Sequence, residues 1–152
     1  MTSKPTQANR NAELVTRLGT DKLVLSSFEI TEELSKPFEI RIECLSDDQN
    51  IDFNPALGQK AHIRYNTIGK AKRYFSGILV EANWFGERDA MSSYQLVLRP
   101  WFWLLTQSAD CKIFQNKTPF QIIEEVFKKS GFTDYEIKKS ENYKEIDYYV
   151  QY

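Results

Sequence analysis

Residues 37–45, PFEIRIECL, decide the fold, because apolar and charged side chains alternate through this stretch. Successive side chains of a β-strand point to opposite faces of the sheet. The apolar face of such a strand would hold Phe38, Ile40, Ile42 and Cys44, and the charged face would hold Glu39, Arg41 and Glu43. The stretch therefore predicts a strand that is buried on one face and exposed on the other.

The same alternation recurs towards the C-terminus and predicts a β-hairpin. Ala61, Ile63 and Tyr65 alternate with polar residues, and a glycine-containing connection at 68–72 leads into a second alternating arm at 73–85. The middle of this second arm is apolar on both faces, as a closed or doubly covered sheet requires. Within the arm, Gly77 is typical of a bend or bulge at which a closed barrel turns a corner.

A further strand is predicted at 92–99, where Tyr94, Leu96 and Leu98 share one face after a polar turn at 86–90. Several strands of this length, joined by short turns, favour a barrel or a sandwich. We therefore predict a mainly β fold, built as a β-barrel of antiparallel strands.

One amphipathic α-helix is predicted at about 118–130 by signals at both of its ends. Thr118 is the expected N-cap, Pro119 takes the first helical position, and Gln121 completes a capping box. Gly131 fits the left-handed position after the last turn. The apolar stripe of this helix consists of Phe120, Ile122, Ile123, Val126 and Phe127.

Alternation returns after the helix, at 135–138 and again from Ile146 to Tyr152, and predicts two more strands. The second of these patterns continues to the final residue of the chain. A natural C-terminus more often ends in a polar, frayed tail, so we expect the chain to be a fragment of a longer protein.

Residues 99–107, RPWFWLLTQ, place five large apolar side chains directly behind Pro100. Proline has no N–H to donate and disfavours a helical Arg99, so the preceding strand is expected to end there. We expect a short helical turn from Pro100 onward, with Trp101 and the two leucines on one face. A bulged strand that pairs Trp101 with Trp103 is the alternative. The run is expected to form a plug between the barrel and the helix-bearing lobe.

The composition is that of a globular protein without a strong overall charge. The 152 residues are 41% hydrophobic and 27% charged, and the formal net charge is -1. No overall attraction to nucleic acid or to an anionic membrane is therefore expected. The first 20 residues hold no continuous apolar segment, and no window approaches the roughly 18 apolar residues of a membrane helix. We expect a protein that is made in the cytoplasm without a general secretory signal and has no membrane segment.

The sequence contains no pattern that predicts catalysis, metal binding or a cofactor. His62, the single histidine, lies on the polar phase of a strand and is expected at the surface. Neither a GxSxG elbow nor a glycine-rich phosphate loop is present. Cys44 and Cys111 form no CxxC pair and are predicted to be reduced, buried thiols. We therefore predict that the chain is not an enzyme.

A basic cluster in the predicted hairpin allows a second interpretation. The basic residues Lys60, Arg64, Lys70, Lys72 and Arg73 flank the aromatic residues Tyr65, Tyr74 and Phe75. Such a face resembles a groove for single-stranded nucleic acid on an oligonucleotide-binding barrel. The alternatives are therefore a free-standing barrel that binds an oligonucleotide or oligosaccharide, and a solvated hairpin tip with no ligand.

Ordered motifs along the chain resemble one known family. They are the turn at 57–59, RYFSGI at 73–78, LRPW at 98–101, DCKIFQNKT at 110–118 and YYVQY at 148–152, with SKPF at 35–38 before the first clear strand. The chain resembles the N-terminal hub region of VgrG proteins, the valine-glycine repeat spike proteins of bacterial type VI secretion systems, which are related to the baseplate hub of bacteriophage T4. The motif residues that we single out are Gly58, Gln59, Arg73, Tyr74, Phe75, Gly77, Arg99, Pro100, Trp101, Trp103, Cys111, Phe114, Gln115, Asn116 and Thr118.

The resemblance implies a non-enzymatic, homotrimeric hub that sits on the tube of the protein Hcp and carries a puncturing needle. Baseplate and effector proteins are further partners that it implies, and secretion would proceed through the type VI machine. A pseudo-sixfold ring of three chains needs two barrels per chain. With the resemblance, we predict a flexible N-terminal tail at 1–12, the first hub β-barrel at 13–112, and at 113–152 a helix with strands that opens a truncated second lobe.

Overall fold

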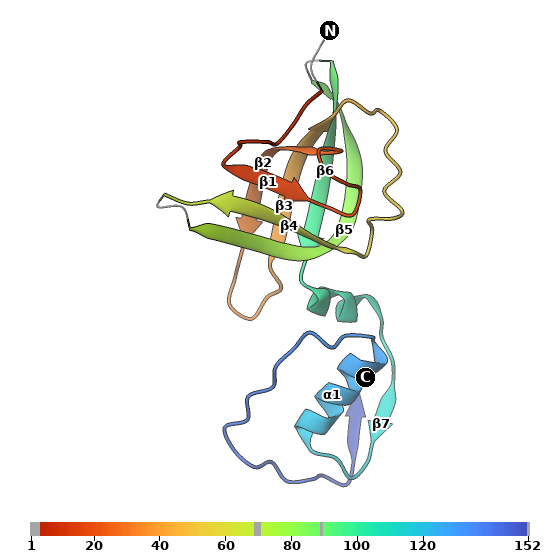
Figure 1. Ribbon diagram of the computed structural model, residues 1–152. Coiled ribbons are helices and arrows are strands. Elements are labelled where there is room, and N and C mark those ends of the chain that lie inside the picture. The colour runs from red at the N-terminus through yellow and green to blue at the C-terminus, as the bar shows by residue number, and fades with distance from the viewer. Residues whose placement is uncertain (1–3, 69–70, 89, 152) are drawn as a thin grey trace. The chain divides into compact units, whose positions relative to one another are not determined.

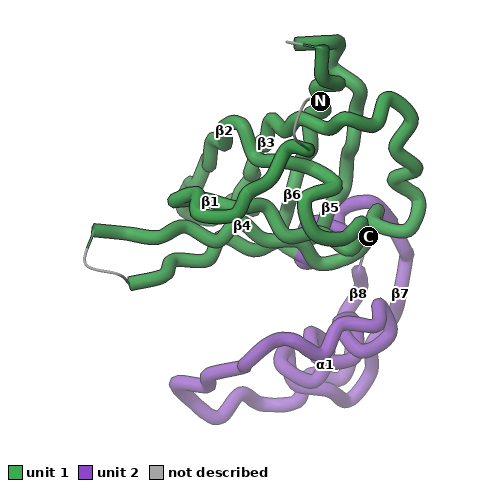
Figure 2. Tube along the Cα trace, turned by 45° about the horizontal axis from the view of Figure 1, so that its top comes forward, with its two compact units in different colours: residues 1–100 green, residues 101–152 purple. Residues whose placement is uncertain are grey.

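The computed structural model describes residues 4–68, 71–88 and 90–151, and the chain divides into two compact units at 1–100 and 101–152 (Figure 2). The division falls after Pro100, whereas the sequence analysis placed it between residues 112 and 113. The difference has a physical reason: Pro100 follows the last strand of the first unit, and Trp101 already packs among aromatic side chains of the second.

The first unit is a six-stranded antiparallel sheet with the order β1-β4-β5-β6-β3-β2 (Figure 1). Its strands are β1 (Ala12–Val15), β2 (Val24–Thr31), β3 (Glu39–Ser46), β4 (Lys60–Asn66), β5 (Lys72–Arg88) and β6 (Met91–Arg99). The predicted mainly β fold is confirmed, as are the strand at 37–45, the hairpin of β4 and β5, and the strand at 92–99.

The core of this unit is formed by the inward faces of the strands, as the alternation predicted. Ile40, Ile42 and Cys44 of β3 are almost fully buried, and Leu96 and Leu98 of β6 lie against them in the same cluster. Burying a large aliphatic side chain of this kind is worth about 1.5 to 3 kcal/mol. The hydrophobic effect on these inward faces therefore provides the main driving force for the curled sheet.

Gly77 does not lie at a bulge, which is one of the two features that the sequence allowed at this position. It pairs in regular register with Ala61 of β4, and the register of β5 against β6 shifts farther along, between Leu79 and Glu81 and between Trp84 and Gly86. A Cβ at position 77 would lie 2.9 Å from the backbone oxygen of Arg99. Glycine is required there because the end of β6 approaches the backbone of β5 too closely for any side chain.

The edge strands β1 and β2 are joined by the side chain of Gln7. Its Oε1 accepts hydrogen bonds from the backbone N–H of Leu14 in β1 at 2.8 Å and of Leu25 in β2 at 3.0 Å. Its Nε2 donates to the backbone oxygen of Leu14 at 3.0 Å. Because no ladder of backbone pairs joins β1 to β2 among the described residues, this buried carboxamide takes the place of backbone pairing where the sheet curls round on itself.

The segment that holds Gln7 is ordered by Asp21. One oxygen of the Asp21 carboxylate accepts from the Gln7 backbone N–H at 2.9 Å, and the other accepts from the Thr6 hydroxyl at 2.7 Å. These hydrogen bonds lower the pKa of Asp21 below its usual value, and the bond from the Gln7 backbone has the largest effect. Residues 6–10 are therefore part of the fold and do not belong to the flexible tail that was predicted at 1–12. The polar composition of this segment suggested a tail, but its polar groups have specific hydrogen-bond partners.

The second unit combines a short helical turn, one helix and two short strands. Its elements are η1, a 3-10 helix (Trp101–Gln107), β7 (Lys112–Phe114), α1 (Pro119–Lys129) and β8 (Tyr149–Gln151). The helical turn after Pro100 is confirmed, and so is the predicted helix with Thr118 as its N-cap and Gln121 in a complete capping box. In the described part of the chain, no helix is long and apolar enough to cross a membrane.

The strand predictions after α1 are only partly correct. Residues 135–138 form no strand, because Tyr135 packs edge-on to Phe127 instead of taking a place in a sheet. Ile146 makes an isolated bridge to Lys117, and β8 pairs antiparallel with β7. Tyr152, the last position of the predicted strand, lies outside the described residues.

We predict that Gln7→Ala destabilises the first unit by about 2 to 4 kcal/mol, because it leaves the buried N–H groups of Leu14 and Leu25 without partners. Urea denaturation followed by fluorescence measures the change. Gln49→Ala is the matched control, since the Gln49 side chain makes one exposed hydrogen bond at 3.3 Å to Glu87 and its loss should cost less than about 0.5 kcal/mol. Equal stability of the two variants would contradict the role of Gln7.

Candidate interaction surface

The outward face of β2, β3, β6 and β5 carries three cross-strand rows that contain charged residues. Directly paired residues of an antiparallel sheet share one face. Two rows are Ser27–Glu43–Gln95–Asn83 and Glu29–Arg41–Val97–Glu81. In the third, Thr31 pairs with Glu39 and Arg99 pairs with Ile78, and the ion pair of Arg99 with Glu39 joins the two halves. The three rows contain four carboxylates and two guanidinium groups, so this face is net acidic.

Glu39 is the centre of the ion pairs on this face. Its carboxylate accepts from Nε of Arg41 at 2.6 Å and from the guanidinium of Arg99. The hydrogen bond to Glu39, followed by the charges of Glu39 and other nearby carboxylates, raises the pKa of Arg41. Arg99, a residue of the LRPW motif, is thus a structural cross-strand partner of β3, and it leaves Glu29 and Glu43 as the less compensated charges beside β2.

Two aromatic side chains of β5 are exposed next to each other because of a bulge. The register passes from Trp84 opposite Tyr94 directly to Gly86 opposite Ser93, so Phe85 is an extra residue in β5. Trp84 is 59% exposed and Phe85 is 62% exposed. Large exposed apolar side chains that lie together are typical of surfaces that contact another protein.

The hairpin of β4 and β5 does not form the aromatic platform that a nucleic-acid groove would need. β4 of this hairpin pairs with β1 and β5 pairs with β6, and only the end of the hairpin where β4 leads into β5 projects beyond the other strands (Figure 1). Tyr65 pairs with Arg73 and shares its face with the inward-pointing Phe75, whereas Tyr74 pairs with Arg64 on the opposite face. The ring of Phe75 lies 5.8 Å from that of Phe28 and packs against the core. The three aromatic rings therefore do not stack on one surface.

The basic residues of the hairpin are partly neutralised. Arg64 forms an ion pair with Glu13 of β1 at 2.5 Å, and the guanidinium of Arg73 lies 4.7 Å from the centre of the Phe75 ring. The ring of His62, on the outer face, lies 5.9 Å from that of Tyr74. Lys70, another member of the predicted cluster, lies outside the described residues.

In the second unit, Glu125 holds the helix to the segment that precedes it. Its carboxylate accepts from Nζ of Lys112 at 2.5 Å and from Nζ of Lys117. The hydrogen bonds of Lys112 and then Lys117 lower the pKa of Glu125 to about 2. The same two ammonium groups lie 4.6 Å and 5.9 Å from the ring centre of Phe114, so charge and packing fix β7 against α1 together.

Trp101 organises an aromatic cluster within the second unit. Its ring is stacked on Phe132 with centroids 4.6 Å apart and meets Phe127 edge-on at 5.0 Å. Tyr135 completes the cluster, 4.9 Å from Phe127. Offset and edge-on geometries are the favourable ones for aromatic pairs. Packing within the second unit therefore accounts for the position of Trp101, and whether the run from Trp101 also plugs the first unit stays a prediction.

The remaining motif residues occupy turns, caps and strand positions. The backbone N–H of Gly58 donates to Leu79 at 2.8 Å, and Oε1 of Gln59 accepts from Arg17 at 2.8 Å. Asn116 has a positive φ of 50° two residues before the Thr118 cap. Phe114 is buried and Gln115 is exposed. The backbone oxygen of Trp103 accepts from the Thr106 hydroxyl at 2.7 Å.

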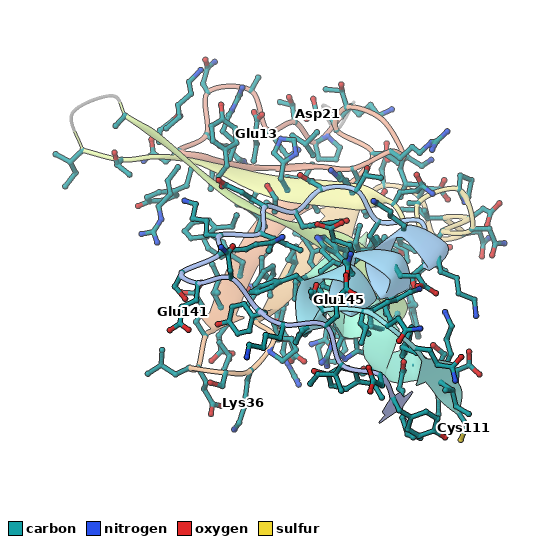
Figure 3. The ribbon with its side chains drawn as sticks, turned by 90° about the horizontal axis from the view of Figure 1, so that it is seen from below. Glu13, Asp21, Lys36, Cys111, Glu141 and Glu145 are labelled. Atoms are coloured by element: carbon teal, nitrogen blue, oxygen red, sulfur yellow. The ribbon has the colours of Figure 1, made fainter. Side chains whose placement is uncertain are left out.

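The two cysteines differ, which corrects half of the expectation that both are buried. Cys44 lies in the core, and burial raises the pKa of its thiol to about 12. Cys111 is exposed (Figure 3), because it precedes β7 in a loop and no strand alternation directs it inward. Across residues 4–68, 71–88 and 90–151, no group of three or more His, Cys, Asp and Glu side chains could hold a metal ion.

Two contacts of the first unit are not predictable from the local sequence. Gln7 was assigned to a tail, since a single glutamine in a polar segment gives no local signal of burial. Glu39 was placed correctly on the charged face of its strand, but its partner Arg99 lies 60 residues away. A cross-strand ion pair of this kind requires knowing that β3 pairs with β6, and alternation within one strand does not name the partner strand.

The family model of the phage tail baseplate hub (GPD) matches residues 31–152, and the chain belongs to this family.

Individual relatives narrow this assignment. The chain is 36% identical over 146 residues to the type VI secretion system spike protein VgrG1b of Pseudomonas aeruginosa. This match covers 96% of this chain and 20% of VgrG1b. It is 35% identical to the spike protein VgrG1a of the same organism, and this match covers 96% of this chain and 23% of VgrG1a. The chain therefore spans about a fifth of the length of these curated relatives.

A solved structure has the same fold. It is that of the E. coli c3393 protein, described as a component of the type VI secretion system with structural similarity to the T4 bacteriophage tail proteins gp27 and gp5. The TM-score is 0.74 at 26% sequence identity, and the match covers 92% of this chain and 39% of the other. The resemblance recognised in the sequence is thus confirmed.

The Glu125 contacts predict acid sensitivity of the second unit. Because the folded-state pKa of about 2 lies below the ordinary value of 4.5, the carboxylate stabilises the fold fully above about pH 4.5, and the stabilisation is lost as the pH falls towards 2. Glu125→Gln should flatten this part of the dependence of melting temperature on pH between 2 and 6. Glu124→Gln, which removes a longer ion pair of 3.7 Å to Lys128, should leave the dependence unchanged.

Proposed function

We propose that this chain is the N-terminal hub portion of the spike of a type VI secretion system, with a structural and not an enzymatic role. The observation that carries the proposal is the similarity to named spike proteins over 96% of the chain. The agreement of its fold with the c3393 protein supports the same conclusion.

The proposed partners are two further copies of the protein, the Hcp tube, and baseplate and effector proteins. A hub of this kind would act by presenting rigid strands to its neighbours, so its function needs a stable sheet and exposed contact residues instead of a catalytic cluster. Trp84 and Phe85 on β5 are suited to such a contact because they are adjacent, apolar and exposed. The protein would be made in the cytoplasm and would leave the cell through the type VI machine.

The alternative function, a free-standing barrel that binds an oligonucleotide or oligosaccharide, receives less support. Stacking of successive bases requires aromatic rings on one accessible face. Tyr74 and Phe75 lie on opposite faces of β5, and Phe75 packs inward. No observation on the described residues favours this function over the hub.

The hub proposal predicts a trimer and an apolar contact on β5. The complete natural gene product that contains this sequence should sediment as a trimer and should retain purified Hcp on an affinity column. The double variant Trp84→Ser and Phe85→Ser should keep the wild-type melting temperature of the first unit, yet lose at least tenfold in trimer or Hcp affinity. The residues are exposed, so the loss would reflect a contact and not unfolding.

Leu34→Ser is the control for this experiment, because Leu34 is also an exposed large apolar residue but lies in the turn between β2 and β3. It should leave both affinities unchanged. A gene product that stays monomeric and ignores Hcp would refute the hub proposal. A normal trimer that binds Hcp but is unaffected by the double variant would refute only the contact at Trp84 and Phe85.

A further inference from the structure

On the outer edge of β2, the backbone groups of Leu25 have side-chain partners, and no strand pairs with this edge among the described residues. One edge of β2 pairs with β3 along its length. On the other edge, the backbone N–H of Leu25 donates to Gln7, and its backbone oxygen accepts from Arg10 at 2.9 Å. The backbone N–H and C=O of Leu25 therefore both have side-chain partners from the N-terminal segment. Such partners prevent another strand from pairing with β2 at this residue.

After Leu25 this protection ends. Ser26 is an extra residue in β2, and from Ser27 to Thr31 the pairing with β3 is regular again. Among the described residues, no other strand pairs with β2 on its outer edge. Every second residue of an edge strand directs its backbone N–H and C=O away from the sheet, so this five-residue edge can accept hydrogen bonds from, and donate them to, one more strand.

The side chains along this edge specify the strand that would fit. Phe28 and Ile30 point towards the core and are only partly buried, so they can cover apolar side chains of an added strand. A shallow groove lined by Arg10, Ala12 and residues 25–28 lies beside Phe28. On the outward face lies Glu29, and Glu32 and Glu33 follow directly after β2.

The charges that face the edge are predominantly negative. Glu43 lies beside Ser27, whose hydroxyl donates to it at 3.0 Å. Arg41, which pairs across the sheet with Glu29, is already engaged by Glu39. Lys36 is engaged by Glu33 at 2.6 Å. Arg10 is the positive group in the groove, and it donates to Leu25. Basic side chains on the outward face of an added strand would therefore be attracted.

We propose that the β2 edge, Ser27–Thr31, is a docking site for an extended polypeptide segment of a partner, in which apolar residues alternate with Lys or Arg. The segment adds a seventh strand to the sheet by β-augmentation. Its apolar side chains lie beside Phe28 and Ile30, and its basic side chains lie beside Glu29 and towards Glu32. The proposal concerns the edge of β2 and is independent of the trimer contact proposed on β5.

The test uses the full 152-residue chain and the synthetic peptide acetyl-KVKVKVK-amide as the probe. Bound peptide should slow amide hydrogen exchange at alternate residues of Ser27–Thr31 by at least tenfold, because only the outward N–H groups gain a partner. A peptide with N-methylated valines should give no protection if backbone hydrogen bonds form the complex. A peptide with Glu in place of Lys should bind at least tenfold more weakly.

Two variants locate the site. Glu29→Lys and, separately, Thr31→Lys should each weaken peptide binding about tenfold, and Thr31→Lys does so without changing the pairing of Glu29 with Arg41. Glu141→Lys, at an exposed carboxylate of the second unit (Figure 3), is the matched charge change and should have no effect. Unchanged melting temperatures exclude unfolding.

Three outcomes would overturn the proposal. The first is protection at residues other than those of β2, or none. The second is equal binding of the N-methylated peptide, which would mean attraction by charge alone. The third is protection of β2 that rises with protein concentration in the absence of peptide, which would identify a second copy of this chain as the occupant.

Discussion

The buried carboxamide of Gln7 is the interaction on which the first unit depends. A curled sheet of six strands has two edges, and here β1 and β2 meet without a backbone ladder between them. Gln7 gives a partner to the N–H of each strand. A buried N–H without a partner costs about 1 to 3 kcal/mol, which is a large fraction of the stability of a small domain. Asp21 holds the segment that contains Gln7 by accepting hydrogen bonds from Thr6 and from the Gln7 backbone. Gln7 and Asp21 together therefore hold the edges of β1 and β2 in place.

Period-two alternation predicts the four strands β3 to β6 of the first unit, but it does not predict β1, β2 or β7. The strand at 37–45 became β3 with the expected inward residues, and the capping box at Thr118 became the N-terminus of α1. Both signals are local, since they depend on neighbours within a few positions. Contacts between distant residues were not predictable in this way. Gln7 reaches Leu25 across 18 residues and Gly77 is needed because Arg99 approaches it, and neither leaves a pattern in the sequence near it.

On the candidate contact surfaces, too, features set by neighbouring residues were predictable, whereas features set by the pairing of distant strands were not. Alternation predicts a mixed-charge outward face on β3, but not the ion pairs that join Glu39 to Arg41 and Arg99. It did not predict that a bulge would expose Trp84 and Phe85 together, because bulges follow from the register of two strands. Among the motif residues, Gly77 and Arg99 meet where β6 ends, Pro100 follows that strand, and Trp101 packs in the aromatic cluster of the second unit.

Native-state hydrogen exchange of the Leu14 and Leu25 amides tests the central claim most directly. If the Gln7 carboxamide closes the sheet, both amides should be protected to nearly the level of the core amides of β3 and β6, and they should exchange only through global unfolding. Exchange of these two amides by local opening, at rates typical of an unprotected edge strand, would show that the seam between β1 and β2 opens independently of the sheet and would contradict the account.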